Sequence, residues 1–207
     1  KISFKDFKER VLEDYRLAVL SRECSLLGRR EVFSGKGKFG IFGDGKELPQ
    51  LAMNHFFQNG DFRSGYYRDQ TLLMAQGLLT VSNVFAALYA HLDQSIEPMS
   101  GGRQMGGHFA TPFRNDKGEW LDLVNLKNHS GDISPTGSQM PRLLGLAQAS
   151  KVYREYNTQN SDKFSKKGNE IAWGTIGNAS TSEGMFFETI NAAGVLQVPM
   201  VISIWDD

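Results

Sequence analysis

The chain has 207 residues, of which 40% are hydrophobic and 22% are charged, as in an ordinary globular protein. Lys and Arg number 23, and Asp and Glu also number 23, so the zero net charge argues against a nucleic-acid-binding protein. The one cysteine, Cys24, excludes an internal disulfide and a cysteine-based zinc site. The apolar stretches are too short or too interrupted to span a bilayer, and the polar start lacks a signal-peptide pattern, so we expect a cytoplasmic protein.

The first part of the chain predicts two helices around a glycine-rich loop. Residues 3–28 predict one long helix, because large apolar side chains recur there at spacings of three and four, and Gly28 marks its end. Residues 34–46 are rich in glycine. Residues 47–58 predict a second helix, which a turn signal at 59–61 follows.

The middle of the chain alternates apolar helices with polar loops. Residues 71–92 predict a buried helix that is apolar on most sides. Residues 98–118 contain proline, paired glycines and charges, and they predict an extended active loop. Residues 137–156 predict another helix, and the polar stretch 157–169 predicts a surface loop.

The last forty residues predict a strand–turn–helix–strand unit. An apolar strand at 170–176 is followed by a tight turn at 177–179, a helix at 182–196 and a second strand at 200–205. Such units build parallel sheets, so we expect an α/β fold whose turn lies at the carboxyl end of a strand, where ligands of open sheets bind. The residues expected to face the sheet from the helix are Phe186, Phe187, Ile190, Ala193 and Gly194.

The turn at 177–184 has the composition of an anion site. Its small residues allow close approach of a backbone to phosphate, and the following helix presents free N–H groups. Asn178 and Asp207 together offer oxygen ligands for Mg²⁺. Turns before helices are often rich in Gly, Asn and Ser, so composition alone leaves a plain structural turn open.

The stretch 177–207 resembles the thiamine-diphosphate motif of 2-oxo acid dehydrogenases. The resemblance implies that Gly177, Asn178, Ala179 and Ser180 bind the cofactor, and that Asn178 and Asp207 hold Mg²⁺. The matching positions, in order, are Gly177, Ser182, Glu183, Gly184, Phe187, Glu188, Asn191, Ala193 and Pro199.

The chain departs from this motif in three places. The family's cation-binding Asp falls on Asn178, and the second Gly of Gly-Asp-Gly falls on Ala179. The family's Glu-Asn-Asn is replaced by residues 205–207, Trp-Asp-Asp, so the later Asn ligand falls on Asp207. One acid and one amide therefore remain in exchanged positions, which preserves the oxygen donors and the charge that a hard cation needs. A decayed site that binds nothing is the alternative.

Residues 61–70 resemble the family segment whose Tyr-Arg pair grips the diphosphate. The resemblance places this role on Tyr67 and Arg68, and a guanidinium suits it because it forms paired hydrogen bonds to phosphate. The alternative is an aromatic turn with a surface ion pair. The literal Gly43-Asp44-Gly45 is not the cofactor motif, because no adequate strand precedes it and the position 29 residues later is Leu73.

Two further segments match the family in order. Residues 100–108 resemble the substrate-pocket loop, where Met105 would contact an acyl chain and His108 the keto acid; a purely structural histidine is the alternative. Residues 133–141 resemble the segment that passes the aminopyrimidine ring, through Ser134 and Thr136. In some members this loop also holds K⁺, a role open to Ser138 and Gln139.

The resemblance runs from about residue 14 to the end and is nearest to the branched-chain-like bacterial type of alpha subunit, or alpha half of a fused chain. It implies one thiamine-diphosphate and Mg²⁺ domain over 1–207, a mostly parallel sheet flanked by helices and truncated on its C-terminal side. The implied reaction is oxidative decarboxylation of a 2-oxo acid with acyl transfer to a lipoyl group. The implied partners are a beta subunit or half, a lipoyl-bearing acyltransferase core and a homodimer or alpha2beta2-like assembly.

The resemblance implies an expectation for the isolated chain and leaves two alternatives open. Because the beta part supplies the glutamate that activates the cofactor, we expect the isolated fragment to be inactive. A cofactor-free scaffold of the same fold and a thiamine-diphosphate enzyme of the transketolase type remain as alternatives.

Overall fold

The computed structural model describes residues 2–103, 105–156 and 161–206. The chain divides into two compact units. The first comprises Lys1–Phe56 and Tyr67–His108, and the second comprises Phe57–Tyr66 and Phe109–Asp207. Within the described residues, no helix combines the length and the apolar character needed to cross a membrane.

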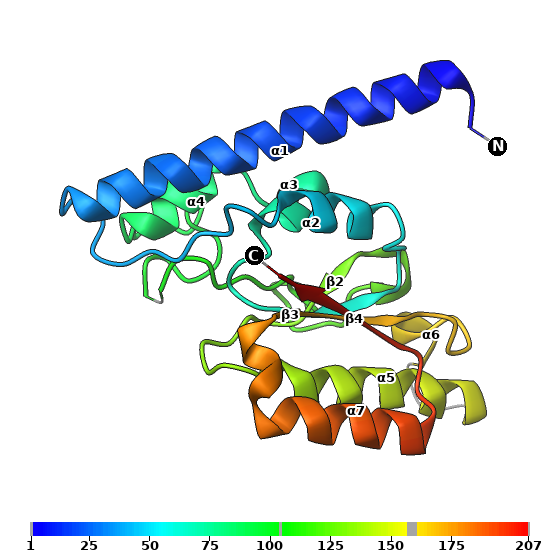
Figure 1. Cartoon of the computed structure of the whole chain (residues 1–207). Helices are drawn as coiled ribbons and strands as arrows, with labels where there is room; N and C mark the ends of the chain where they lie inside the picture. Colours follow the sequence, from blue (N-terminus) through cyan, green and yellow to red (C-terminus); the bar gives the residue numbers. More distant parts are fainter. Residues whose placement is uncertain (1, 104, 157–160, 207) are drawn as a thin grey trace. The chain divides into compact units, whose positions relative to one another are not determined.

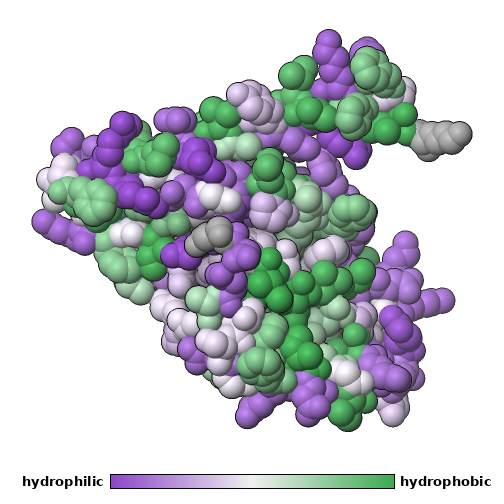
Figure 2. All heavy atoms as spheres, in the orientation of Figure 1, coloured by the Kyte–Doolittle hydropathy of each residue, from purple (hydrophilic) through white to green (hydrophobic). Residues whose placement is uncertain are grey.

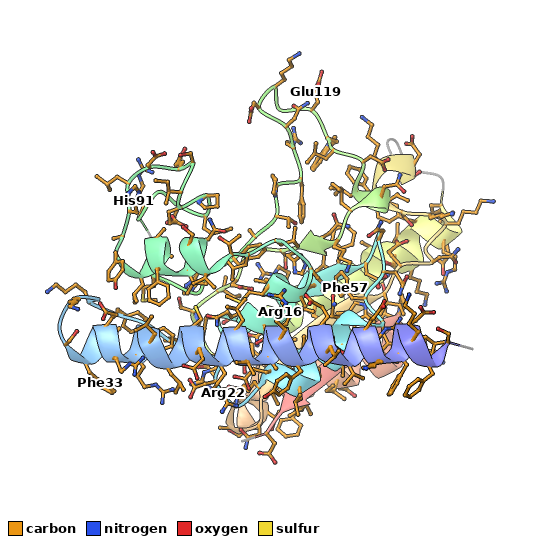
Figure 3. All side chains as sticks on the ribbon, turned by 90° about the horizontal axis from the view of Figure 1, so that it is seen from above. Arg16, Arg22, Phe33, Phe57, His91 and Glu119 are labelled. Carbon is orange, nitrogen blue, oxygen red and sulfur yellow. The ribbon has the colours of Figure 1, made fainter. Side chains whose placement is uncertain are left out.

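The first unit is helical. Its longest helix, α1, is contacted by each of the other three and is seen from above in Figure 3, with Arg16 and Arg22 along it and Phe33 near its end. The helices of this unit are α1 (Phe4–Phe33), α2 (Glu47–Asn54), α3 (Gln70–Ala75) and α4 (Val81–Leu88).

The predicted end of α1 at Gly28 is wrong. A Cβ on Gly28 would lie 2.4 Å from the ring of Phe42, so this glycine permits a close contact within the helix rather than terminating it. The helix ends at Phe33 with Ser34 as its C-cap, and Gly35 follows with a positive φ of 78°, the conformation that commonly closes helices.

The single helix predicted over 71–92 is also wrong, because two short helices occupy this stretch. Gly77, with a φ of 70°, follows the end of α3. Thr80 then accepts a hydrogen bond from the N–H of Asn83, and the Asn83 side chain accepts one from the N–H of Thr80. This reciprocal capping starts α4 as a new helix.

The second unit contains a parallel sheet, which confirms the predicted α/β class. The strand order is β2-β1-β3-β4; α5 lies against the sheet and α7 packs beside it (Figure 1). The strands are β1 (Phe62–Ser64), β2 (Asn128–His129), β3 (Ala172–Gly177) and β4 (Met200–Trp205). The helices are η1 (Leu123–Asn125), α5 (Gln139–Glu155), α6 (Ser161–Phe164), η2 (Ala179–Ser182) and α7 (Gly184–Leu196).

The core of the second unit forms where α5 meets the sheet. Met140, Leu143 and Ala147 are fully buried on the inner face of α5. A Cβ on Gly174 would lie 2.2 Å from the Leu143 side chain, so a glycine in β3 lets the helix approach the sheet closely.

The inner face of α7 differs from the predicted one. Phe186 packs against the core and Thr189 is buried, whereas Phe187 is 62% exposed and Ile190 is 44% exposed. Gly194 is exposed as well. Because α7 packs beside α5 and starts two residues later than predicted, its inward face differs from the one that the pattern indicated.

Candidate cofactor-binding site

The strand order places a reversal at β1. The chain passes from β1 to β2 on one side and later returns to β3 on the other side. In open parallel sheets, ligands bind outside the carboxyl ends of the strands at such a reversal. The segments at these ends are Gly65–Tyr66 after β1 and 178–183 after β3.

The turn after β3 is exposed and closely tied to β4. Gly177 pairs with Trp205, and the N–H of Asn178 donates to the Trp205 carbonyl at 3.1 Å. The helix predicted to start at Ser182 is preceded by the tight turn η2, so α7 starts at Gly184. Glu183, the N-cap of α7, makes no side-chain capping bond, which leaves the first N–H groups of the helix for an anion.

Two other segments of the second unit lie at this turn. The hydroxyl of Tyr66 is 3.6 Å from the position that a Cβ on Gly177 would take, and the Tyr66 ring packs on Trp205. Gly137 has a φ of 78°, and a Cβ placed on it would lie 3.4 Å from the side chain of Glu183. The structure therefore brings the loop with exposed Ser134 and Thr136 to the turn of the predicted phosphate site. Tyr66 was not predicted as a neighbour of that turn.

The predicted cation ligands are only partly described. The side-chain amide of Asn178 donates to the carboxylate of Asp206 at 2.5 Å. Asp207, the predicted second ligand, lies outside the described residues. In the part of the chain that is described, no three His, Cys, Asp or Glu side chains cluster as a metal site. An amide oxygen, such as that of Asn178, and one carboxylate form a donor set that Mg²⁺ accepts when phosphate and water supply its other ligands.

Tyr67 and Arg68 belong to the first unit. The Arg68 carbonyl accepts a hydrogen bond from Gln50, and a Cβ on Gly43 would lie 2.5 Å from that carbonyl. The literal Gly-Asp-Gly thus packs against the backbone of Arg68. Within the described residues, the buried Nε of Arg68 has no hydrogen-bond partner. An unpaired buried donor is costly, and a phosphate oxygen would satisfy it.

The predicted substrate loop, residues 100–108, lies next to Tyr67 within the first unit. The ring of His108 lies 6.4 Å from the Tyr67 ring, and its Nδ1 is 3.0 Å from the Met105 carbonyl. Met105 itself is exposed. The neighbouring segment is organised by Glu97, whose buried carboxylate accepts N–H groups of three residues, namely Met99, Ser100 and Gly102.

Burial would raise the pKa of Glu97, but the backbone hydrogen bonds outweigh it and lower the pKa. Glu97 therefore stays charged and fixes the loop. No pattern in the sequence distinguishes it from a surface acid.

A buried polar cluster supports the carboxyl ends of β1 and β2. Arg63 donates to Asp132 at 2.6 Å and to Nδ1 of His129 at 3.2 Å. Burial lowers the pKa of His129, and the charges of Arg63 and Lys127 lower it further, so this ring is neutral. Arg142 donates to Ser64, and its pKa is lowered by burial. Sequence reasoning missed this cluster, which ties the Ser134 loop to the sheet.

The family model described as dehydrogenase E1 component matches residues 15–205. The chain belongs to this family. It is 28% identical over 198 residues to the 2-oxoisovalerate dehydrogenase subunit alpha of Bacillus subtilis (strain 168), covering 93% of this chain and 50% of that protein.

A second relative carries a different substrate in its name. The chain is 26% identical over 201 residues to the pyruvate dehydrogenase E1 component subunit alpha of Acholeplasma laidlawii, covering 95% of this chain and 46% of that protein. The chain thus spans about half the length of both relatives. The predicted resemblance to alpha subunits of 2-oxo acid dehydrogenases is confirmed.

Proposed function

We propose that this member of the E1 component family binds thiamine diphosphate and Mg²⁺ as the alpha part of a 2-oxo acid dehydrogenase. The observation that carries the proposal is the exposed turn after β3, which opens onto the uncapped start of α7. The cofactor, when bound, supplies the nucleophilic carbon and the electron sink for decarboxylation. The acyl product would pass to a lipoyl group on an acyltransferase core.

The proposed diphosphate contacts are supported in each unit separately. In the second unit, Gly177, Ala179 and Ser180 bring the backbone and a hydroxyl to the start of α7. In the first unit, the unpaired Nε of Arg68 offers a charged donor, and Tyr67 adds a phenol. Asn178 and Asp207 would supply oxygen ligands to Mg²⁺.

The loops at 133–141 and 100–108 would supply the remaining contacts, to the aminopyrimidine ring, K⁺ and the substrate. Ser134 and Thr136 would contact the aminopyrimidine ring, and the N-terminal turn of α5, with Ser138 and Gln139, would hold K⁺ where it is present. The amide nitrogen of Gln139 donates to the Thr175 carbonyl at 3.0 Å, so its oxygen is the atom available to a cation. Met105 and His108 would line the substrate pocket.

A beta subunit or beta half would supply the glutamate that activates the cofactor, in a homodimer or an alpha2beta2-like assembly. Exposed large apolar side chains on α1 and α7 support the existence of partner-covered faces. Without that glutamate, these residues bind and orient the cofactor but do not start its chemistry.

Calorimetry with thiamine diphosphate and Mg²⁺ tests the proposal. Arg68→Ala should weaken binding by about 2 kcal/mol, roughly 30-fold, because a charged hydrogen bond from a partly buried group is lost. Arg10→Ala, on the exposed face of α1, is the matched control and should bind like the parent. If the parent protein binds no cofactor, the cofactor-free scaffold becomes the better assignment; the direct bond between Asn178 and Asp206 is the observation in its favour.

A further inference from the structure

A cavity lies near the start of β1 and β3, at the opposite end of these strands from the turn at 177–184, which is called the phosphate turn below because it is proposed to bind the diphosphate. Its volume is about 290 Å³, and it lies entirely within the second unit. Phe62, which begins β1, and Glu170, two residues before β3, line it. Because Glu170 and Gly177 lie at opposite ends of β3, extended chain of about 20 Å separates the cavity from the turn.

Aromatic rings form most of the wall. Trp120 meets Phe164 edge-on at 4.9 Å between ring centres, and Tyr153 stacks on Phe164 at 6.2 Å. Phe62 and Phe113 form a further edge-on pair. These contacts hold the rings in place without a ligand, and the faces of such rings attract cations.

The ring of Trp120 already contacts a cationic side chain, that of Arg114. The guanidinium of Arg114 lies 3.8 Å from the centre of the Trp120 ring. This contact shows that the Trp120 π-face is accessible to a positive group and is electrostatically suited to one.

The cavity also contains a charge without a counterion. Glu170 is 7% exposed, and among the described residues it has no hydrogen bond or ion pair. Burial raises the pKa of Tyr153, and the charge of Glu170 raises it further, so the phenol stays neutral. Glu170 is the one charged group among the described residues that line the cavity, and a cationic ligand would give it a counterion inside an otherwise aromatic and apolar wall.

We propose that this cavity binds a small organic ammonium ion, with the ammonium group against Glu170 and an apolar body among the rings. The volume is at the lower end of the range for ligand pockets, so the ligand is small. A metal ion does not fit, because Glu170 is the one charged group among the described residues that line the cavity, and hard cations need several oxygen ligands.

Calorimetry with 2-phenylethylammonium and the neutral 2-phenylethanol tests the charge requirement. The parent protein should bind the ammonium saturably and about tenfold or more tightly than the alcohol, the scale of a charge-assisted contact. Absence of saturable ammonium binding, or equal affinity for the two probes, would overturn the proposal. This comparison needs no variant, so it decides even if a variant fails to fold.

Variants then assign the site. Glu170→Gln should lose the preference for ammonium and keep binding of the alcohol, whereas Glu155→Gln, an exposed acid at the end of α5 that does not line the cavity, should behave like the parent. Ala149→Leu should fill the cavity and weaken both probes. Preference unchanged in Glu170→Gln would place the ammonium elsewhere. Cofactor binding should be the same in all variants, because the cavity and the phosphate turn lie at opposite ends of β3.

Discussion

At the scale of single residues, Asn178 links the two strands that frame the phosphate turn. Its backbone N–H bonds to Trp205 and its side-chain nitrogen bonds to Asp206. Since the nitrogen is bonded to Asp206, the amide oxygen is the atom that remains for a cation. Asp206 thus orients the side chain of Asn178, which is proposed as a ligand, and Asp207 is the second proposed ligand.

These different roles predict different magnesium affinities. Asp207→Asn should lose magnesium-dependent cofactor binding most severely, because no carboxylate ligand would remain. Asp206→Ala should weaken it by roughly 10-fold to 100-fold, the usual cost of removing a group that orients a metal ligand. The double variant Asn178→Asp plus Asp207→Asn should bind like the parent, because it restores one acid and one amide. Parent-like affinity in Asp207→Asn, measured by magnesium titration, would remove Asp207 from the site.

His129 predicts a pH dependence of stability. Its pKa in the folded protein is well below the usual 6.5, so the unfolded chain binds a proton that the folded chain does not. The stability contribution of the neutral ring is complete above pH 6.5 and falls as the pH drops toward the folded pKa. The expected slope is at most about 1.4 kcal/mol per pH unit in this window.

Urea unfolding from pH 7.5 downward measures this slope. His129→Gln should unfold more easily at neutral pH, since the ring stacks on Phe57 and accepts a bond from Arg63. It should nevertheless lose less stability than the parent between neutral and acidic pH. Parallel curves for the two proteins would show that His129 does not titrate as described.

At the scale of elements, the sequence predicted the apolar strands and missed the polar ones. The prediction for β4 at 200–205 matches the structure, and that for β3 is displaced by one to two residues, because both are apolar runs. β1 and β2 are short and carry Arg63, Asn128 and His129 into the interior. Their polarity is balanced by partners distant in sequence, such as Asp132 for Arg63, and no local pattern reveals such pairings.

In the candidate site, too, some residues were predicted from the sequence and others were not. Motif order located the turn at 177–184 and the loop at 133–141, and the structure brings these two segments together. The supporting residues Tyr66 and Arg142 were not predicted, because their functions depend on contacts with residues distant in sequence. Glu97 was also not predicted, although the N–H groups that it accepts lie within five residues of it. A motif identifies residues that face a ligand, whereas the residues that position them follow from packing.

Two glycines in regular elements predict opposite stability changes. Gly174→Ala should destabilise the protein by about 1–3 kcal/mol, because its Cβ would overlap Leu143 in a filled core. Gly194→Ala on α7 has nothing within 4 Å of its Cβ position and should stabilise the helix by roughly 0.5–1 kcal/mol. Denaturant unfolding of both variants measures the difference. Equal effects would contradict the close contact between α5 and β3.

At the scale of the whole molecule, the described surface exposes large apolar side chains in groups. Figure 2 shows hydrophobic residues over the region where β4 and α7 lie in Figure 1. β4 is the last strand of the described sheet, and Ile204 on it is half exposed. On α7, Phe187, Ile190 and Val195 are exposed. Apolar groups of this kind usually mark surfaces that another protein covers.

This α7–β4 face predicts self-association of the isolated protein. Because exposed Phe187 and Ile190 gain by leaving water, sedimentation at micromolar concentrations should give a mass above that of a single chain. The double variant Phe187→Ser plus Ile190→Ser should sediment as a single chain. Its unfolding free energy should fall by roughly 1 kcal/mol or less per site, because Phe187 is 62% exposed and Ile190 is 44% exposed. Leu48→Ser, an equally exposed apolar position on α2, is the control and should associate like the parent. A parent protein that sediments as a single chain would show that this face alone does not drive association.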